Sequence, residues 1–166
     1  ITRKIKNNPE IRFLIEKSWN TDNFEIRHYF KKKIIKNCAA YRMARPFKYH
    51  KDDVGGAHLD LHFNNKIYRN HNILYTIWVP VTGFNKKYTL RLSPESHKKN
   101  HSITNLKKQS KYISKVFKES YLKKFKFTRL NMRQGEVLIF HPNLLHGGSI
   151  NLGNKTRASY DLRIYN

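Results

Sequence analysis

Two histidines and one aspartate carry the first chemistry that this sequence suggests. His58 and Asp60 form a His-x-Asp pair, and His146 follows much later in the chain. Two imidazoles and one carboxylate are the ligand set of a facial-triad Fe(II) site, which leaves the opposite coordination positions open for a cosubstrate and oxygen. Arg157 follows soon after and would supply the cation that a dicarboxylate cosubstrate needs. The order of these residue types therefore predicts a non-haem iron site.

The first half of the ligand set can be read in two directions. If residues 57–63 form a strand, then His58, Asp60 and His62 share one face of it. If that face points into a closed barrel, a buried aspartate is costly, and a bound divalent cation would resolve the cost. His58 pairs with Asp60 in the usual direction, and His62 pairs with it in the reverse direction. We favour His58 as the ligand and expect His62 to orient a ligand or to face the substrate.

The second histidine has several candidates further along the chain. His71 and His101 lie in polar, loop-like segments, His97 follows an expected strand, and His141 precedes a proline at an expected turn. His146 begins a short strand and is followed by two glycines, which allow the backbone to approach a ligand closely. We therefore favour His146.

The C-terminal segment supports the same site independently. Residues 157–165 alternate between a polar and an apolar face, as a strand does when one face is turned inwards. Arg157 and Ser159 on the polar face can bind a carboxylate through guanidinium and hydroxyl donors. Asp161 and Arg163 on the same face can pair with each other. An exposed edge strand of mixed charge is the alternative explanation.

These motifs resemble the Fe(II)/2-oxoglutarate-dependent oxygenase superfamily. The resemblance is greatest to its phytanoyl-CoA hydroxylase-type and streptomycin-biosynthesis-type small-molecule hydroxylases. It covers roughly residues 55–165 and includes, besides the candidates above, the segments 75–81, 92–97 and 135–141. Glu95 departs from the pattern, since this branch more often has glycine before Ser-His.

The resemblance implies both a cofactor set and a reaction. Fe(II) would bind to His58, Asp60 and His146, and the distal carboxylate of 2-oxoglutarate would bind to Arg157 with Ser159. The implied enzyme is a dioxygenase that uses O2 to hydroxylate a small-molecule metabolite, such as a sugar, an amino acid or a phosphate-linked compound, and releases succinate and CO2. An oxygenase acting on nucleic acid or protein, and a cupin-like metal-dependent isomerase or binding protein, are the alternatives.

Helices followed by many short strands predict an α+β chain, and the resemblance makes its core a double-stranded β-helix, or jelly roll. We expect one domain over residues 1–166, with helical N-terminal support over 1–45 and the jelly-roll core over 46–166. Helices are predicted at 9–19, at 22–38 with Asp22 as N-cap, and at 105–124 as an inserted helix. The predicted strands are 57–63, 73–81, 88–92, 126–131, 136–140, 144–150 and 157–165.

The chain of 166 residues has a formal net charge of +23. A basic surface can attract nucleic acid, anionic membranes or a phosphate-bearing substrate. The basic residues are dispersed, however, and no zinc-finger spacing or RNA-recognition aromatic motif is present. The excess of lysine fits compositional drift on solvated faces best, and an anionic substrate is the second explanation. We expect a small-molecule substrate and do not expect nucleic acid or a membrane as partner. Because Cys38 is the single cysteine and no leader-like segment is seen, we expect a cytoplasmic protein.

Overall fold

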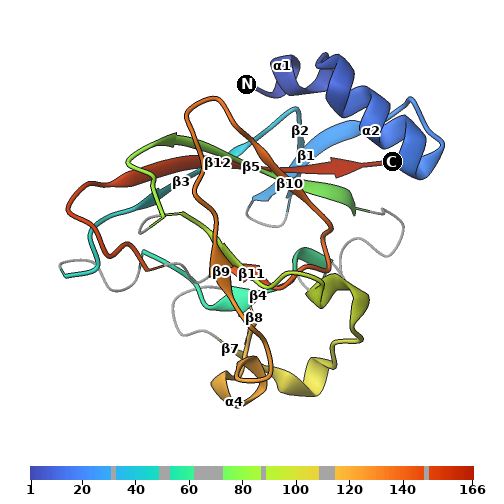
Figure 1. Cartoon of the computed structure of the whole chain (residues 1–166). Coiled ribbons are helices and arrows are strands. Elements are labelled where there is room, and N and C mark those ends of the chain that lie inside the picture. Colours follow the sequence, from blue (N-terminus) through green and yellow to red (C-terminus); the bar gives the residue numbers. More distant parts are fainter. Residues whose placement is uncertain (31–32, 49–52, 62–72, 87–88, 109–114, 148–149) are drawn as a thin grey trace.

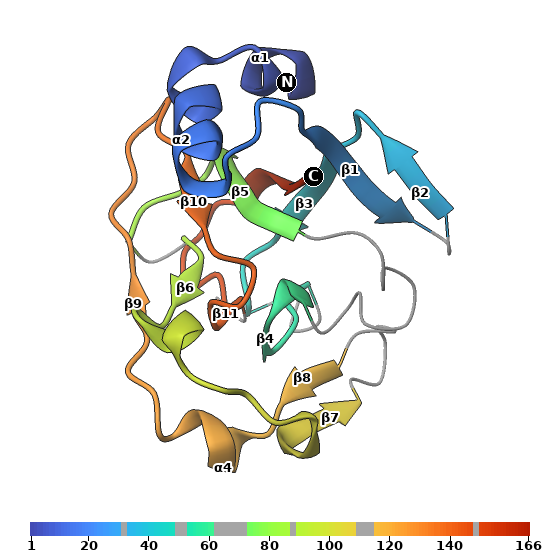
Figure 2. The ribbon, with the colours of Figure 1, turned by 90° about the vertical axis from the view of Figure 1, so that its right-hand side faces the viewer.

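The computed structural model describes residues 1–30, 33–48, 53–61, 73–86, 89–108, 115–147 and 150–166. Two antiparallel sheets form the body of the molecule, and the smaller sheet lies across from the larger one (Figures 1 and 2). The two N-terminal helices lie beside the larger sheet, near the C-terminus of the chain (Figure 1). In chain order the elements are α1 (Thr2–Lys6), α2 (Pro9–Trp19), β1 (Glu25–Phe30), β2 (Lys33–Lys36), β3 (Ala40–Ala44), β4 (Ala57–His58), β5 (Ile73–Thr82), β6 (Arg91–Leu92), η1 (Ser96–Lys98), η2 (Ile103–Asn105), β7 (Leu106–Lys108), β8 (Lys115–Phe117), α4 (Glu119–Leu122), β9 (Thr128–Arg129), β10 (Leu138–Phe140), β11 (His146–Gly147) and β12 (Arg157–Tyr165).

The larger sheet is built around β12. Its strand order is β10-β5-β12-β1-β2, and β3 also pairs with β12. The smaller sheet has the order β4-β11-β6-β9, and β7 and β8 form a separate pair. β5 is long because it carries a continuous run of residues that suit a sheet buried on both faces, rich in β-branched and aromatic side chains. β12 instead alternates polar and apolar residues, and most of its positions are buried. The predictions of these two strands are confirmed almost to the residue.

The first predicted helix is confirmed. α2 spans Pro9–Trp19, and the Asn8 side chain caps it by accepting from the Ile11 N–H at 3.0 Å. Ile11 and Ile15 on one face of this helix are buried in a cluster with residues of the larger sheet. The helix therefore covers one face of that sheet.

The helix predicted for residues 22–38 is wrong. This segment forms β1 and β2, and β1 pairs with β12 so that Ile26 stands opposite Ile164. Phe24 and Ile26 are both buried, and their spacing of two residues is that of a strand. The N-terminal part of the chain therefore contributes strands to the main sheet as well as helical support.

The inserted helix predicted for residues 105–124 is also largely wrong. The described residues there form β7, β8 and the short helix α4, while residues 109–114 lie outside the described part of the chain. Val116 and Phe117 are buried, and Phe117 packs in a cluster with Leu59 and Leu145 of the smaller sheet region. Packing of adjacent large residues against a sheet favoured strand pairing over the lysine-rich helical stripe.

Among the described residues, no helix combines the length and apolar character that crossing a bilayer requires.

Candidate metal centre

Three potential metal ligands meet between the two sheets. His58 on β4 and His146 on β11 stand directly opposite each other in the antiparallel register. Asp60 follows β4 in a helical turn, and its backbone N–H donates to the Pro142 carbonyl at 3.0 Å. One nitrogen or oxygen atom of each of the three side chains lies within 4.8 Å of the other two. The structure thus brings together the three residues favoured from the sequence, although the strand expected over 57–63 ends at His58.

The other histidine candidates of the described segments lie outside this group. His101 uses both ring nitrogens in hydrogen bonds, to a tyrosine hydroxyl at 2.9 Å and to a backbone carbonyl at 2.7 Å. His141 accepts from a backbone N–H at 3.0 Å, and its ring centroid lies 5.6 Å from that of His97. His62 and His71 fall on residues that the structure does not describe.

Both imidazoles of the group present the same nitrogen to the centre. His58 Nδ1 lies 3.0 Å from the Gly56 carbonyl oxygen, and His146 Nδ1 lies 2.8 Å from the Leu144 carbonyl oxygen. A carbonyl oxygen only accepts, so each Nδ1 carries the proton and donates it. In a neutral imidazole held in this way the lone pair is on Nε2, which is the arrangement that a histidine ligand to a metal commonly has.

Gly147 permits the close approach of these two strands. Its backbone has φ +93°, in the region that favours glycine. A Cβ atom at this position would lie 2.7 Å from Cε1 and 2.8 Å from Nδ1 of His58. The glycine predicted to allow close backbone approach therefore makes room for a ligand imidazole.

The Asp60 carboxylate is fully buried and is held by two side chains of the larger sheet. Arg163 Nη2 donates to Oδ1 at 2.5 Å, and the Thr76 hydroxyl donates to Oδ2 at 2.5 Å. His146 Nε2 lies 3.8 Å from the same Oδ2. Burial raises the pKa of Asp60, but opposing effects, of which the positive charge of Arg163 is the largest, hold the pKa below its usual value. The carboxylate is therefore ionised, as binding a cation requires.

The contact with Arg163 offers a second explanation for the burial of Asp60. Arg163 was expected to pair with Asp161, and it does lie 3.5 Å from that carboxylate, but its shorter contact is with Asp60. Because Arg163 supplies a positive charge, the burial of Asp60 does not by itself require a metal. The metal site rests instead on the meeting of three ligand atoms and on the orientation of the two imidazoles.

Sequence reasoning missed the two partners of Asp60. Arg163 could have been chosen as a candidate site residue, since it shares the polar face of its strand with Arg157 and Ser159. For Thr76 the indication was weaker: it is a hydroxyl side chain within the largely apolar strand Ile73–Thr82. The pairing register that places Thr76 opposite Arg163 was not accessible from the sequence.

Burial also sets the charge of the first histidine. It lowers the pKa of His58 to about 3, and the neighbouring His146 contributes to the shift in the same direction. The imidazole is therefore neutral at physiological pH. A neutral imidazole is the form that can bind a metal ion.

Arg157 and Ser159 lie on β12 as predicted, and both are buried. The Arg157 guanidinium carbon is 5.8 Å from the centroid of the Trp78 ring. Burial, together with the charge of Arg129, lowers the pKa of Arg157 to about 10, so the side chain stays cationic at neutral pH. Within the described part of the chain, Ser159 Oγ is buried and makes no hydrogen bond. A buried hydroxyl with unused hydrogen-bonding capacity marks a place where a polar ligand fits.

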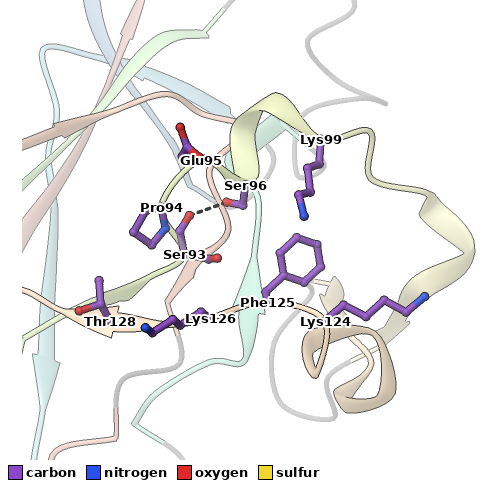
Figure 3. A pocket seen from close by; sticks show the side chains of 9 residues that line it. All are labelled: Ser93, Pro94, Glu95, Ser96, Lys99, Lys124, Phe125, Lys126 and Thr128. Carbon is purple, nitrogen blue, oxygen red and sulfur yellow. Dashed lines mark hydrogen bonds between the residues drawn. The ribbon is translucent and has the colours of Figure 1, made fainter.

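A separate pocket of about 480 Å³ lies between η1 and the segment that follows α4 (Figure 3). Lys99, Lys124 and Lys126 line it together with Phe125, and Lys99 Nζ lies 5.2 Å from the centroid of the Phe125 ring. Ser96 lines this pocket and also contacts the segment that carries His146. Its Oγ accepts a hydrogen bond from the backbone N–H of Leu145 at 2.8 Å. The three ligand candidates do not line this pocket.

Solved structures share this fold at low sequence identity. AviO1 from Streptomyces viridochromogenes Tue57 superposes with a TM-score of 0.53 at 12% identity, over 96% of this chain and 57% of that one. The α-ketoglutarate-dependent epimerase SnoN from nogalamycin biosynthesis gives 0.58 at 13%, over 99% and 55%. EctD from S. alaskensis, solved with bound Fe, gives 0.56 at 14%, over 99% and 52%. The chain thus spans just over half the length of these proteins.

No curated protein matches the chain significantly in sequence. The profile of one family, described as phytanoyl-CoA dioxygenase (PhyH), matches residues 14–159 and so covers most of the chain. This range contains the three ligand candidates together with Arg157 and Ser159. The superfamily expected from the sequence is confirmed: the chain belongs to the phytanoyl-CoA dioxygenase (PhyH) family of non-haem iron, 2-oxoglutarate-dependent oxygenases.

Proposed function

We propose that this chain is an Fe(II)- and 2-oxoglutarate-dependent dioxygenase that hydroxylates a small-molecule metabolite. The observation that carries the proposal is the meeting of His58, Asp60 and His146 within 4.8 Å, with Nδ1 of each histidine directed at a backbone carbonyl oxygen. We take the two facing sheets as the double-stranded β-helix of this superfamily, and residues 1–166 as one catalytic domain. The single cysteine suits a reducing compartment, and we place the activity in the cytoplasm.

The donor set fits iron in its chemistry. Two imidazoles and one carboxylate on one side of an ion leave the opposite side open, as in the non-haem Fe(II) oxygenases. When bound, iron and 2-oxoglutarate together supply the oxidising chemistry, with succinate and CO2 as products. His58 and His146 would hold the ion through Nε2, and the buried Asp60 carboxylate would neutralise part of its charge.

Arg157 and Ser159 are proposed to hold the distal carboxylate of 2-oxoglutarate. Arg157 remains cationic and is backed by the Trp78 ring, which restrains the guanidinium plane. Ser159 Oγ offers a donor that the described residues leave unused. Arg129 adds a further positive charge close enough to lower the pKa of Arg157, and such repulsion is relieved by an anion.

The substrate is proposed to carry an anionic group. The net charge is +23, and three lysines line the pocket that Ser96 connects to β11. The structural neighbours include an epimerase and a carbocyclase of nogalamycin biosynthesis, so members of this fold direct oxidation to different outcomes. Hydroxylation is the outcome proposed for this chain, and product analysis would distinguish it from epimerisation or ring closure.

The proposal is tested by measuring succinate formed from 2-oxoglutarate in air, with Fe(II) and ascorbate and without any primary substrate. We expect slow, iron-dependent succinate production that is lost when a chelator is added. Asp60→Ala should abolish it, and Lys126→Ala, a change in the separate pocket, should leave it intact. Production that is the same in Asp60→Ala and in the wild type would rule out this site as its source.

A further inference from the structure

We propose that Arg163 is a positioning residue that restricts Asp60 to binding the metal through one oxygen, and thereby reserves a coordination position for oxygen. The inference rests on the proposed function, because it concerns the same metal centre. It assigns a role to a residue that is not itself a ligand. It follows from the different partners of the two carboxylate oxygens of Asp60.

The two carboxylate oxygens have different partners. Arg163 Nη2 donates to Oδ1 at 2.5 Å, whereas Oδ2 receives the Thr76 hydroxyl at 2.5 Å and lies 3.8 Å from His146 Nε2. Oδ2 is therefore the oxygen that lies close to the candidate ligand imidazole of His146. Oδ1 is engaged by a charged donor whose hydrogen bond is among the strongest that proteins form.

The larger sheet holds this arrangement rigidly. Arg163 on β12 and Thr76 on β5 stand opposite each other in the antiparallel register, so both side chains project from the same face. Asp60 belongs to the segment that follows β4 of the smaller sheet. The carboxylate is thus oriented by a cross-strand pair of the opposite sheet, independently of the strands that carry the two histidines.

Arg163 is itself fixed from the other side. Nη2 also lies 3.5 Å from the Asp161 carboxylate, and Nη1 lies 3.5 Å from His28 Nδ1 on β1. The Arg163 side chain is only 12% exposed. A guanidinium with several partners and little access to water keeps its orientation better than a surface arginine does.

The chemical consequence concerns the open side of the metal. A carboxylate can bind a metal through one oxygen or through both. With two imidazoles and one carboxylate oxygen, a six-coordinate ion keeps enough positions for a chelating keto acid and for oxygen. If Oδ1 also bound the ion, the last of these positions would be filled. Arg163 prevents this by occupying Oδ1.

The test uses nitric oxide as a probe of the oxygen position. The wild type is loaded with Fe(II) and 2-oxoglutarate without oxygen, and the visible charge-transfer band of the chelated keto acid is recorded. Nitric oxide is then titrated and followed by the electron paramagnetic resonance signal of the iron–nitrosyl complex. Arg163→Gln is compared with Arg163→Lys and with the control Arg42→Gln, since Arg42 contacts Asp161 at 3.8 Å and is 55% exposed.

Arg163→Gln should keep the charge-transfer band but bind nitric oxide roughly 10-fold or more weakly, the size of effect common for partners of metal ligands. Arg163→Lys, which keeps the charge and one donor, should restore part of the affinity, and Arg42→Gln should match the wild type. A lower melting temperature with unchanged nitric oxide affinity would show a merely structural role and overturn the inference.

If Arg163→Gln does not fold, a second measurement tests whether Asp60 binds the metal through one oxygen. In a structure of the wild type loaded with Mn(II), the inference requires Oδ2 on the metal and Oδ1 on Arg163; both oxygens of Asp60 on the metal would overturn it. Failure of the proposed function looks different, because the wild type would then form no charge-transfer band with Fe(II) and 2-oxoglutarate.

Discussion

His58 and His146 face each other across β4 and β11, with their ring centroids 4.4 Å apart. Each ring is turned by a hydrogen bond from Nδ1 to the carbonyl oxygen two residues before it in the chain. The backbone next to each histidine therefore sets both its tautomer and its direction. Local backbone structure thus contributes to the orientation of both rings before a metal binds.

Gly147→Ala should disrupt this pair. The new methyl group would lie 2.7 Å from the His58 ring, and the backbone would have to keep φ +93°. We expect Fe(II) affinity, measured by anaerobic titration, to fall by about 10-fold or more, as for other changes around ligands. The control is Gly135→Ala, where φ is +90° but no described atom lies within 4 Å of the new Cβ. Equal loss of iron affinity in both variants would show that backbone strain, and not the contact with His58, is responsible.

Asp60→Ala should abolish iron binding and also destabilise the metal-free protein. Removing the carboxylate takes from the buried Arg163 its closest counter-charge, and breaking such a pair costs about 3 kcal/mol. Urea unfolding of the metal-free protein measures this loss. Asp161→Ala is the matched control, because it removes the more distant carboxylate at 3.5 Å. It should retain iron binding and lose less stability; retained iron binding in Asp60→Ala would remove this residue from the ligand set.

Arg157→Ala should weaken 2-oxoglutarate and leave Fe(II) binding nearly unchanged. Hydrogen bonds to a charged group contribute about 1.5–3 kcal/mol, so affinity for the cosubstrate should fall by roughly 10-fold to 100-fold. Ser159→Ala should show a smaller effect in the same direction. The intensity of the charge-transfer band against 2-oxoglutarate concentration measures both. Loss of iron affinity with unchanged 2-oxoglutarate affinity would contradict the assignment.

The metal-free protein should lose stability as the pH falls below about 6.5. The pKa of His58 is lowered from 6.5 to about 3 in the folded state, so between these values the unfolded chain binds the extra proton. Stability then rises with pH across this window, by up to about 1.4 kcal/mol per pH unit for one group. Urea unfolding at several pH values should show a smaller slope in His58→Gln. Part of the slope should remain, since burial also lowers the pKa of His28, His101 and His141.

Glu95→Gly should stabilise the protein. Glu95 has φ +61°, in the left-handed region that costs a residue with a side chain about 1 kcal/mol, and its ion pair with Lys98 is exposed and weak. A rise in melting temperature of a few degrees is expected. Lys99→Gly, at φ −98°, serves as the control and should lower the melting temperature. A lower melting temperature in Glu95→Gly would mean that the Glu95 side chain makes a stronger interaction than its ion pair.

The meeting of the three candidate ligands could be predicted because their chemistry is encoded locally. His58 and Asp60 are separated by one residue, and Gly147 marks a close approach next to His146. The strand alternation expected for His58 and Asp60 does not explain the position of Asp60, because β4 ends at His58. A helical turn with a backbone hydrogen bond to Pro142 does so instead.

The partners of Asp60 and the N-terminal strands could not be predicted in the same way. The contact between Arg163 and Asp60 joins residues 103 positions apart, and it depends on how the two sheets face each other. In the segment 22–38, Phe24 and Ile26 match a strand while later apolar residues also match a helix. Pairing of Ile26 with Ile164 decided between the two, and such pairing is a tertiary effect on a weak local preference.

The central claim is tested most directly by anaerobic titration of the metal-free wild type with Fe(II) and then with 2-oxoglutarate. We expect one Fe(II) per chain, followed by a weak visible charge-transfer band whose midpoint moves to higher 2-oxoglutarate concentration in Arg157→Ala. If Fe(II) bound but no band formed, the cosubstrate assignment would be contradicted. If Fe(II) did not bind, the assignment of His58, Asp60 and His146 as a metal centre would be contradicted.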